Sequence, residues 1–189
     1  LALPGLYNIY NALAGASFGL ALGLDEKAIA AALSGFECGF GRMETIAIQD
    51  KELKMILVKN PTGFNQVLRY LLTQEKPFVL AFAINDRLAD GTDISWLWDV
   101  DFEVLALMAE RVRNFYVSGI RAEDMAVRLK YAGISTDRIR MEKDYRQLIT
   151  RALQETGAGE TCCILPTYTA MLDIRRILKK QFGLKEFWK

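Results

Sequence analysis

The residues best suited to chemistry lie in one acidic segment near the middle of the chain, residues 85–103. This segment carries six carboxylates and two tryptophans within 19 residues; the carboxylates are Asp86, Asp90, Asp93, Asp99, Asp101 and Glu103. Such a cluster can bind a cation, hold an ammonium group or orient an imidazole supplied by another element. The same residue types are ordinary in solvated turns, so their spacing alone favours a turn.

The absence of histidine limits what the chain can do alone. It cannot supply a Ser-His-Asp or Cys-His arrangement, and it lacks the commonest metal ligand. Acid–base chemistry would use Asp, Glu, Lys or Tyr, or a histidine from a partner.

Cys38, Cys162 and Cys163 are odd in number, and the last two are adjacent in an apolar run. This pattern argues against a disulfide framework or a metal site and predicts core cysteines in a reducing compartment.

Two other loops also follow predicted strands, where open α/β sheets form their ligand crevices. In residues 59–65, Lys59 beside the first amides of a helix suits a phosphate or carboxylate. The alternative is a plain strand-to-helix turn capped by Thr62. Residues 166–169 leave the same choice open, between hydroxyl contacts to a ligand and ordinary helix capping.

Composition excludes several classes of protein. The 189 residues are 51% apolar and carry 24 Lys and Arg against 23 Asp and Glu, a formal charge of +1. This balance predicts no nucleic-acid partner, because such partners require clustered excess base. No apolar run approaches the roughly 20 residues of a membrane helix, and no signal-peptide pattern is present. The sequence therefore predicts a soluble, cytosolic protein without an integral membrane segment.

Strand and helix patterns alternate from about residue 53 to residue 181. Continuous apolar runs predict buried strands at residues 78–84, 114–117 and 161–165, after a hairpin of residues 43–48 and 53–58. Apolar residues at helical spacing predict helices around residues 122–129, 145–152 and 171–178. Connections too long for hairpins imply a three-layer α/β fold, with a mostly parallel sheet and one short antiparallel strand.

The first 34 residues have a different character. Residues 6–34 are rich in Ala, Leu and Gly and predict two helices, separated at Gly23 and with Asp25 as the second N-cap. A glycine-rich stretch at residues 35–41 predicts a linker, with a domain boundary near residue 38. The chain begins at Leu1 and contains neither a phosphate loop nor a Gly-x-Gly-x-x-Gly motif. We therefore expect a piece of a longer protein that holds half of an active site.

Four motifs occur in an order typical of one family. They are Leu3-Pro4-Gly5-x-Tyr7-Asn8-x-Tyr10-Asn11-Ala12-Leu13-Ala14, Gly41-Arg42-Met43-Glu44, Lys59-Asn60-Pro61-Thr62-Gly63-Phe64-Asn65, and Asn85-Asp86-x-x-Ala89-Asp90-Gly91-x-Asp93-x-Ser95-Trp96-x-x-Asp99-x-Asp101-Phe102-Glu103. Over nearly its whole length the chain resembles the C-terminal part of the MurT family, the Mur-ligase-like subunits of lipid II isoglutaminyl synthase. The resemblance implies that residues 1–37 are the last helices of an ATPase domain and residues 38–189 a Rossmann-like C-terminal domain.

The resemblance also implies an activity. Members amidate the D-isoglutamate of the lipid II stem peptide in the cytoplasm, at the inner face of the membrane, with ammonia that a GatD-type glutaminase subunit releases. ATP and Mg²⁺ would be bound mainly upstream of this chain, and Zn²⁺ only by an upstream insertion. By similarity Asp93 is catalytic and Asn11 lies on the nucleotide side. Arg42 is a second nucleotide-side candidate or an ion-pair partner of Glu44. Supporting roles fall to Lys59, Asn60, Asp86, Asp90, Asp99 and Asp101.

One departure from ordinary Mur ligases leaves alternatives open. Where those enzymes carry an Asp-x-x-His-Asn-Pro signature, this chain has Ile56-Leu57-Val58-Lys59-Asn60-Pro61. The change favours the MurT branch over general Mur ligases and weakens nucleotide contacts from this loop. The alternatives are another amide ligase of the Mur and folylpolyglutamate synthase type, or a non-catalytic docking module. The 189 residues alone are expected to be inactive.

Overall fold

The computed structural model describes residues 6–36 and 43–183, and the chain divides into two compact units, Leu1–Gly39 and Phe40–Lys189. The first unit contains helices α1 (Leu6–Ala21) and α2 (Glu26–Ser34). The Asp25 carboxylate caps α2 by accepting from the Ala28 amide at 3.1 Å, as the sequence predicts. Many large apolar side chains of this unit are exposed: Ile9, Tyr10, Leu13, Phe18, Leu20, Leu22 and Leu24.

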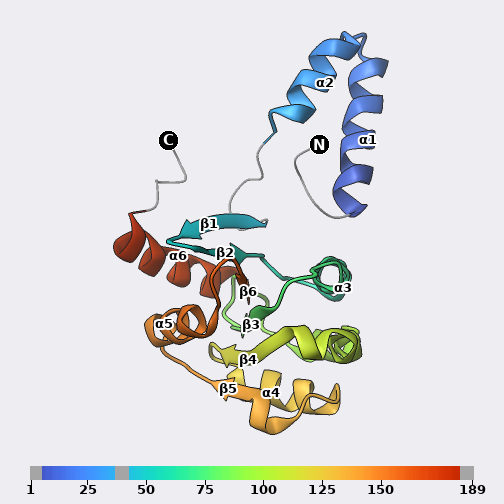
Figure 1. Cartoon of the computed structure of the whole chain (residues 1–189). Helices are drawn as coiled ribbons and strands as arrows, with labels where there is room; N and C mark the ends of the chain where they lie inside the picture. Colours follow the sequence, from blue (N-terminus) through green and yellow to red (C-terminus); the bar gives the residue numbers. More distant parts are fainter. Residues whose placement is uncertain (1–5, 37–42, 184–189) are drawn as a thin grey trace. The chain divides into compact units, whose positions relative to one another are not determined.

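The second unit is built on a six-stranded sheet in the order β1-β2-β6-β3-β4-β5 (Figure 1). The strands are β1 (Glu44–Ile48), β2 (Lys51–Met55), β3 (Phe78–Ala83), β4 (Val112–Ser118), β5 (Ile139–Met141) and β6 (Thr161–Pro166). Neighbouring strands run parallel except β1, which pairs antiparallel with β2. The predicted mixed, mostly parallel sheet is confirmed.

Helices cover both faces of this sheet and complete the three layers (Figure 1). One face carries α3 (Pro61–Leu72), the 3-10 segments η1 (Ser95–Asp99) and η2 (Phe102–Arg111), and α4 (Ala122–Tyr131). The other carries α5 (Tyr145–Glu155) and α6 (Tyr168–Phe182). A short 3-10 turn, η3 (Thr136–Arg138), precedes β5.

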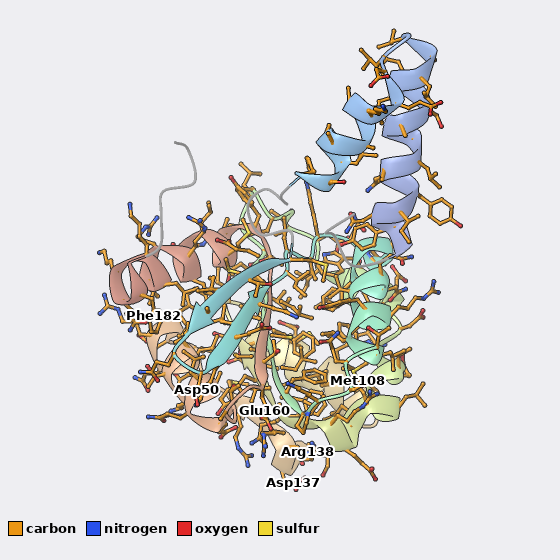
Figure 2. The ribbon with its side chains drawn as sticks, turned by 45° about the horizontal axis from the view of Figure 1, so that its top comes forward. Asp50, Met108, Asp137, Arg138, Glu160 and Phe182 are labelled. Carbon is orange, nitrogen blue, oxygen red and sulfur yellow. The ribbon has the colours of Figure 1, made fainter. Side chains whose placement is uncertain are left out.

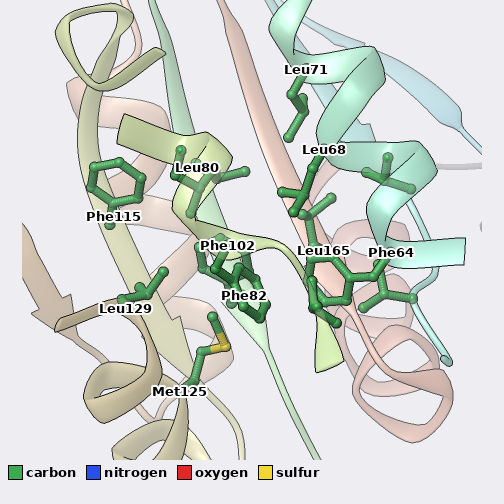
Figure 3. Packing of buried hydrophobic residues seen from close by; sticks show 14 of the residues in the cluster. Phe64, Leu68, Leu71, Leu80, Phe82, Phe102, Phe115, Met125, Leu129 and Leu165 are labelled. Carbon is green, nitrogen blue, oxygen red and sulfur yellow. The ribbon is translucent and has the colours of Figure 1, made fainter. Parts of the chain in front are cut away.

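A cluster of buried aromatic rings fixes the first layer against the sheet (Figure 3). The Phe64 ring of α3 meets Phe102 of η2 edge-on, with ring centroids 4.9 Å apart, and lies 6.1 Å from Phe82 of β3. These three side chains are fully buried. Burying a side chain of this size contributes about 1.5–3 kcal/mol to folding. The aromatic cluster therefore holds the irregular segment 95–111 on the sheet.

The structure corrects some boundaries that the sequence predicts. The second hairpin strand begins at Lys51, because a two-residue turn at Gln49 and Asp50 already reverses the chain. Strand β5 was not predicted, because it is a three-residue edge strand whose Ile-Arg-Met sequence shows no apolar run. Cys162 and Cys163 lie on β6 as buried core residues, as predicted, whereas Cys38 lies outside the described residues.

Gly119, which follows β4, occupies a position that admits no side chain. Its φ is +88°, and a Cβ atom there would lie 2.4 Å from the Ile84 carbonyl oxygen and 2.8 Å from Oδ1 of Asn85. Gly133 has nearly the same φ, +87°, but a Cβ atom there would meet nothing within 4 Å. The two glycines thus separate the effect of backbone conformation from the effect of close approach.

Gly119→Ala should destabilise the chain by roughly 3 kcal/mol, from backbone strain plus the clash, against about 1–2 kcal/mol for Gly133→Ala from strain alone. Urea unfolding of both variants measures the difference. Equal losses in the two variants would show that the carbonyl of Ile84 moves aside without cost.

Candidate functional site at the carboxyl end of the sheet

The loops that leave β3, β4 and β6 are joined by one buried side chain, Asn85, which is 2% exposed. Its backbone N–H donates to Oγ1 of Thr167 at 2.9 Å, and its Nδ2 donates to Oγ1 of Thr169 at 2.9 Å. Its Oδ1 accepts from the Ile120 amide at 2.9 Å and from the Tyr145 hydroxyl at 3.2 Å. Polar groups buried in this way must be hydrogen-bonded, so Asn85 fixes the three loops relative to one another.

Two of the predicted acidic residues strengthen the same junction. Asp90 accepts from the Thr169 amide at 2.7 Å and from the Thr169 hydroxyl at 2.6 Å. Asp86 forms an ion pair with Arg121, whose Nε donates to it at 2.8 Å. Both carboxylates are thus engaged in holding loops together, which suits a supporting role.

Asp93 is different, because its carboxylate is exposed and oriented by its own neighbour. Its Oδ1 accepts from the Ser95 amide at 2.7 Å and its Oδ2 from the Ser95 hydroxyl at 3.0 Å. The backbone bond, and then the hydroxyl bond, lower the pKa of Asp93, so the group is ionised at neutral pH. Each carboxylate oxygen can accept a further hydrogen bond.

Asp93 lines a hollow of about 440 Å³ between the η1 region and α4. One wall comes from the η1 region and the other from α4; the lining residues are Asp93, Ile94, Ser95, Leu97, Trp98, Glu123, Asp124 and Val127. Glu123 pairs with Lys143, and Asp124 lies 3.6 Å from Arg121. The hollow is lined by carboxylates together with aromatic and aliphatic side chains. Such a surface accepts a cationic or hydrogen-bond-donating side chain.

The remaining acidic candidates lie beside this hollow without lining it. Asp99 and Asp101 are exposed on the same segment. The Asp101 amide donates to Oδ1 of Asn65 at 2.9 Å, which ties the segment to α3. Trp96 packs against the core, whereas Trp98 is 56% exposed, so the two tryptophans of the segment have different roles.

The loop at residues 59–65 is a strand-to-helix turn. Asn60, rather than Thr62, caps α3, because its Oδ1 accepts from the Gly63 amide at 2.8 Å. Lys59 precedes this cap with an exposed side chain. Thr167 likewise occupies the N-cap position of α6, but its hydroxyl contacts Asn85 instead of capping the helix. The first loop is therefore capped by an asparagine side chain, and the second is held by the backbone of Asn85.

The nucleotide-side candidates belong to other parts of the chain. Asn11 is an exposed residue of α1, in the first unit, and Arg42 lies outside the described residues.

Across residues 6–36 and 43–183, no group of three His, Cys, Asp or Glu side chains could hold a metal ion. Burial raises the pKa of Cys162 and Cys163, the latter to about 12, so neither thiol is a nucleophile at neutral pH.

Sequence reasoning missed the residues that complete the hollow. An Asp followed two residues later by Ser is a common local hydrogen-bonding pattern, so the role of Ser95 had a sequence signal. Glu123 and Asp124 had none, because only the tertiary fold brings α4 opposite η1.

Comparison with known proteins identifies the family. The family model "MurT ligase C-terminal" matches residues 57–171. The chain is 36% identical, over 190 aligned residues, to the MurT subunit of lipid II isoglutaminyl synthase (glutamine-hydrolyzing) from Streptococcus pneumoniae. The chain belongs to the MurT family. The match covers 98% of this chain and 41% of the pneumococcal subunit, so the chain spans about two fifths of that relative.

Solved structures place the fold of this MurT chain among Mur ligases. UDP-N-acetylmuramate-alanine ligase MurC from Thermotoga maritima matches with a TM-score of 0.70 at 15% identity, over 98% of this chain and 40% of MurC. Folylpolyglutamate synthase from Mycobacterium tuberculosis, complexed with ADP and AMPPCP, matches with a TM-score of 0.69 at 20% identity, over 98% and 42% of the chains. The predicted Rossmann-like fold is thereby confirmed.

Within the described residues no helix has the length and apolar character to cross a membrane.

Ser95→Ala should raise the pKa of Asp93 toward its ordinary value, because one of its two hydrogen bonds is lost while the backbone bond remains. A carbon-13 NMR titration of the Asp93 carboxyl group measures this shift. Ser135→Ala is the control: the Ser135 hydroxyl also donates to an exposed aspartate two residues away, Asp137, so its removal should leave the pKa of Asp93 unchanged. An Asp93 pKa that does not change in Ser95→Ala would contradict the assigned cause.

The sign of the pH effect on stability follows from the same shift. Because the pKa of Asp93 is lower in the folded chain, its contribution is present above the unfolded value. That contribution is lost as the pH falls through the folded value. Ser95→Ala should therefore move this loss to higher pH.

Proposed function

We propose that this chain is the C-terminal part of the MurT subunit of lipid II isoglutaminyl synthase, an ATP-dependent ligase with glutamine as amide donor. Its reaction converts the D-isoglutamate of the stem peptide to D-isoglutamine. The family match supports the assignment. The observation that carries the site is an exposed, oriented and ionised carboxylate, Asp93, in a chain without histidine.

The chemistry divides into two half-reactions. A carboxylate oxygen of the substrate attacks the γ-phosphorus of ATP, and ADP leaves. Ammonia then attacks the carbonyl carbon of the acyl phosphate, and phosphate leaves as the amide forms. ATP and Mg²⁺ are assigned mainly to the upstream ATPase domain, and Zn²⁺ only to its insertion.

Residues 1–37 are assigned to the end of that ATPase domain, with Asn11 and Arg42 on the nucleotide side. The exposed apolar side chains of α1 support this assignment, because a helix pair in water normally buries such residues. Residues 38–189 form the C-terminal domain. Lipid II, the lipid-linked substrate, would be met in the cytoplasm at the inner face of the membrane.

In this proposal a GatD-type glutaminase supplies the cysteine nucleophile and the histidine. Asp93 accepts a hydrogen bond from that imidazole, fixes its tautomer and stabilises its cationic form. The role requires a carboxylate that is charged, held in one orientation and reachable from outside, and Asp93 combines these properties. Glu123 and Asp124 also line the hollow, but each is paired with a cation, Lys143 and Arg121, so the charge available to an imidazolium is that of Asp93.

Asp93→Asn, made in the full-length protein with its glutaminase subunit, should lower glutamine-dependent amidation roughly 10²–10⁴-fold, because an amide no longer orients the imidazole correctly. Amidation driven by added ammonium chloride should be retained, since free ammonia bypasses the glutaminase. Glutamate release and amidated product are measured side by side.

Asp137→Asn is the matched control for this experiment. Asp137, labelled in Figure 2, is also exposed and also hydrogen-bonded by a serine two residues away, but it lies in η3 rather than on the hollow. Its replacement should leave both activities intact. Normal glutamine-dependent activity in Asp93→Asn would remove Asp93 from the mechanism. Amino-acid-dependent ADP release would instead favour a Mur or folylpolyglutamate-type ligase.

A further inference from the structure

Arg128 is the most heavily engaged cation beside the hollow, and it is 4% exposed. Its guanidinium reaches from α4 to the segment that follows Asp93. Nε donates to the Leu97 carbonyl at 3.2 Å and Nη2 to the Val100 carbonyl at 2.8 Å. Nη1 and Nη2 reach the two carboxylate oxygens of Glu103, at 2.9 and 3.0 Å. This geometry is the bidentate arginine–carboxylate fork.

The same guanidinium also lies over two aromatic rings of this segment. Its central carbon is 5.4 Å from the centroid of Trp98 and 5.1 Å from that of Phe102. Arg128 therefore contacts side chains or carbonyl groups throughout residues 97–103. Lysine could not reproduce this arrangement, because a single ammonium lacks the planar fork and the stacking face.

The backbone groups of residues 95–103 find few hydrogen-bond partners within the segment itself, so they require partners from elsewhere in the fold. Short 3-10 segments leave their last carbonyl groups without intrahelical partners. The bend at Val100 separates η1 from η2. Two carbonyl groups at this junction, those of Leu97 and Val100, accept from Arg128. The Asp101 amide donates to the side chain of Asn65.

Arg128 also belongs to the helix that forms the opposite wall of the hollow. Glu123 and Asp124, about one turn earlier on α4, and the adjacent Val127 line the hollow that Asp93 and Trp98 line from the η1 region. A buried side chain that bonds one wall and emerges from the other sets the distance between them. Resting on the proposed role of Asp93, we propose that Arg128 is a positioning residue, which holds the Asp93 carboxylate where the partner's imidazole must meet it.

The test is a double-mutant cycle in the full-length protein with its glutaminase subunit. Arg128→Met keeps much of the side-chain volume and removes the guanidinium. It should lower glutamine-dependent amidation roughly 10- to 100-fold, because a displacement of about 1 Å is enough for such a loss. Ammonium-dependent amidation should stay near wild type. In the Asp93→Asn background, Arg128→Met should cause no further loss, because coupled residues are non-additive.

Arg138→Met is the matched control. Arg138, labelled in Figure 2, is also partly buried, lies over the Phe115 ring at 5.5 Å and donates to the carbonyl groups of Ala109 and Val112, but it does not line the hollow. Arg128 does not line the hollow either, but it bonds residues 97–103, whereas these partners of Arg138 lie beyond that segment. Arg138→Met should therefore lower the melting temperature without selectively lowering the glutamine-dependent rate. Arg128→Lys should retain an intermediate rate, and it provides the measurement if Arg128→Met does not fold.

The outcomes separate this inference from the proposed function. Full glutamine-dependent activity in Asp93→Asn would overturn both. If Asp93→Asn is inactive, three results would overturn the role of Arg128 alone. They are normal activity in both Arg128 variants, an equal loss with ammonium and glutamine, and an additional loss in the Asp93→Asn background.

Discussion

The buried amide of Asn85 is the contact on which the carboxyl end of the sheet depends. From the loop after β3, its side chain bonds Thr169 of α6, the Ile120 amide after β4 and the Tyr145 hydroxyl, and its backbone N–H bonds Thr167 after β6. Because a buried polar group left without partners is costly, each of these loops has one preferred position. Gly119 must remain a glycine for the same reason, since any Cβ atom there would meet the Asn85 side chain.

This rigid junction divides the acidic residues of the segment into two groups. Asp86 and Asp90 use their oxygen atoms to bind Arg121 and Thr169, and they hold the loop. Among the residues that the structure describes, Asp93 is hydrogen-bonded only by Ser95, and its exposed carboxylate is open to another molecule. The distinction is one of exposure and partners rather than residue type, because all three are aspartates close together in the sequence.

In the proposed function, the exposed Asp93 of this histidine-free chain forms part of an active site shared between subunits. In that proposal, an aspartate contributed by a second subunit would activate the imidazole only after assembly. Ammonia would then be released only where it can be used. Arg128 couples this site to the rest of the fold. Its hydrogen bonds link the position of the Asp93 segment to the packing of α4 against η1.

The sequence by itself determined most of the sheet and of its helices, and it singled out the acidic segment as a candidate site. Continuous apolar runs mark β3 and β6 because both faces of those strands are buried, and helical periodicity marks α4, α5 and α6. The tertiary structure alone decided that Asn60 caps α3, that β5 completes the sheet edge, and that Glu123, Asp124 and Arg128 face the Asp93 segment. Those contacts join residues 20 to 35 positions apart, or depend on competition between neighbouring side chains. Local patterns do not encode them, because packing selects among several arrangements that the sequence permits equally.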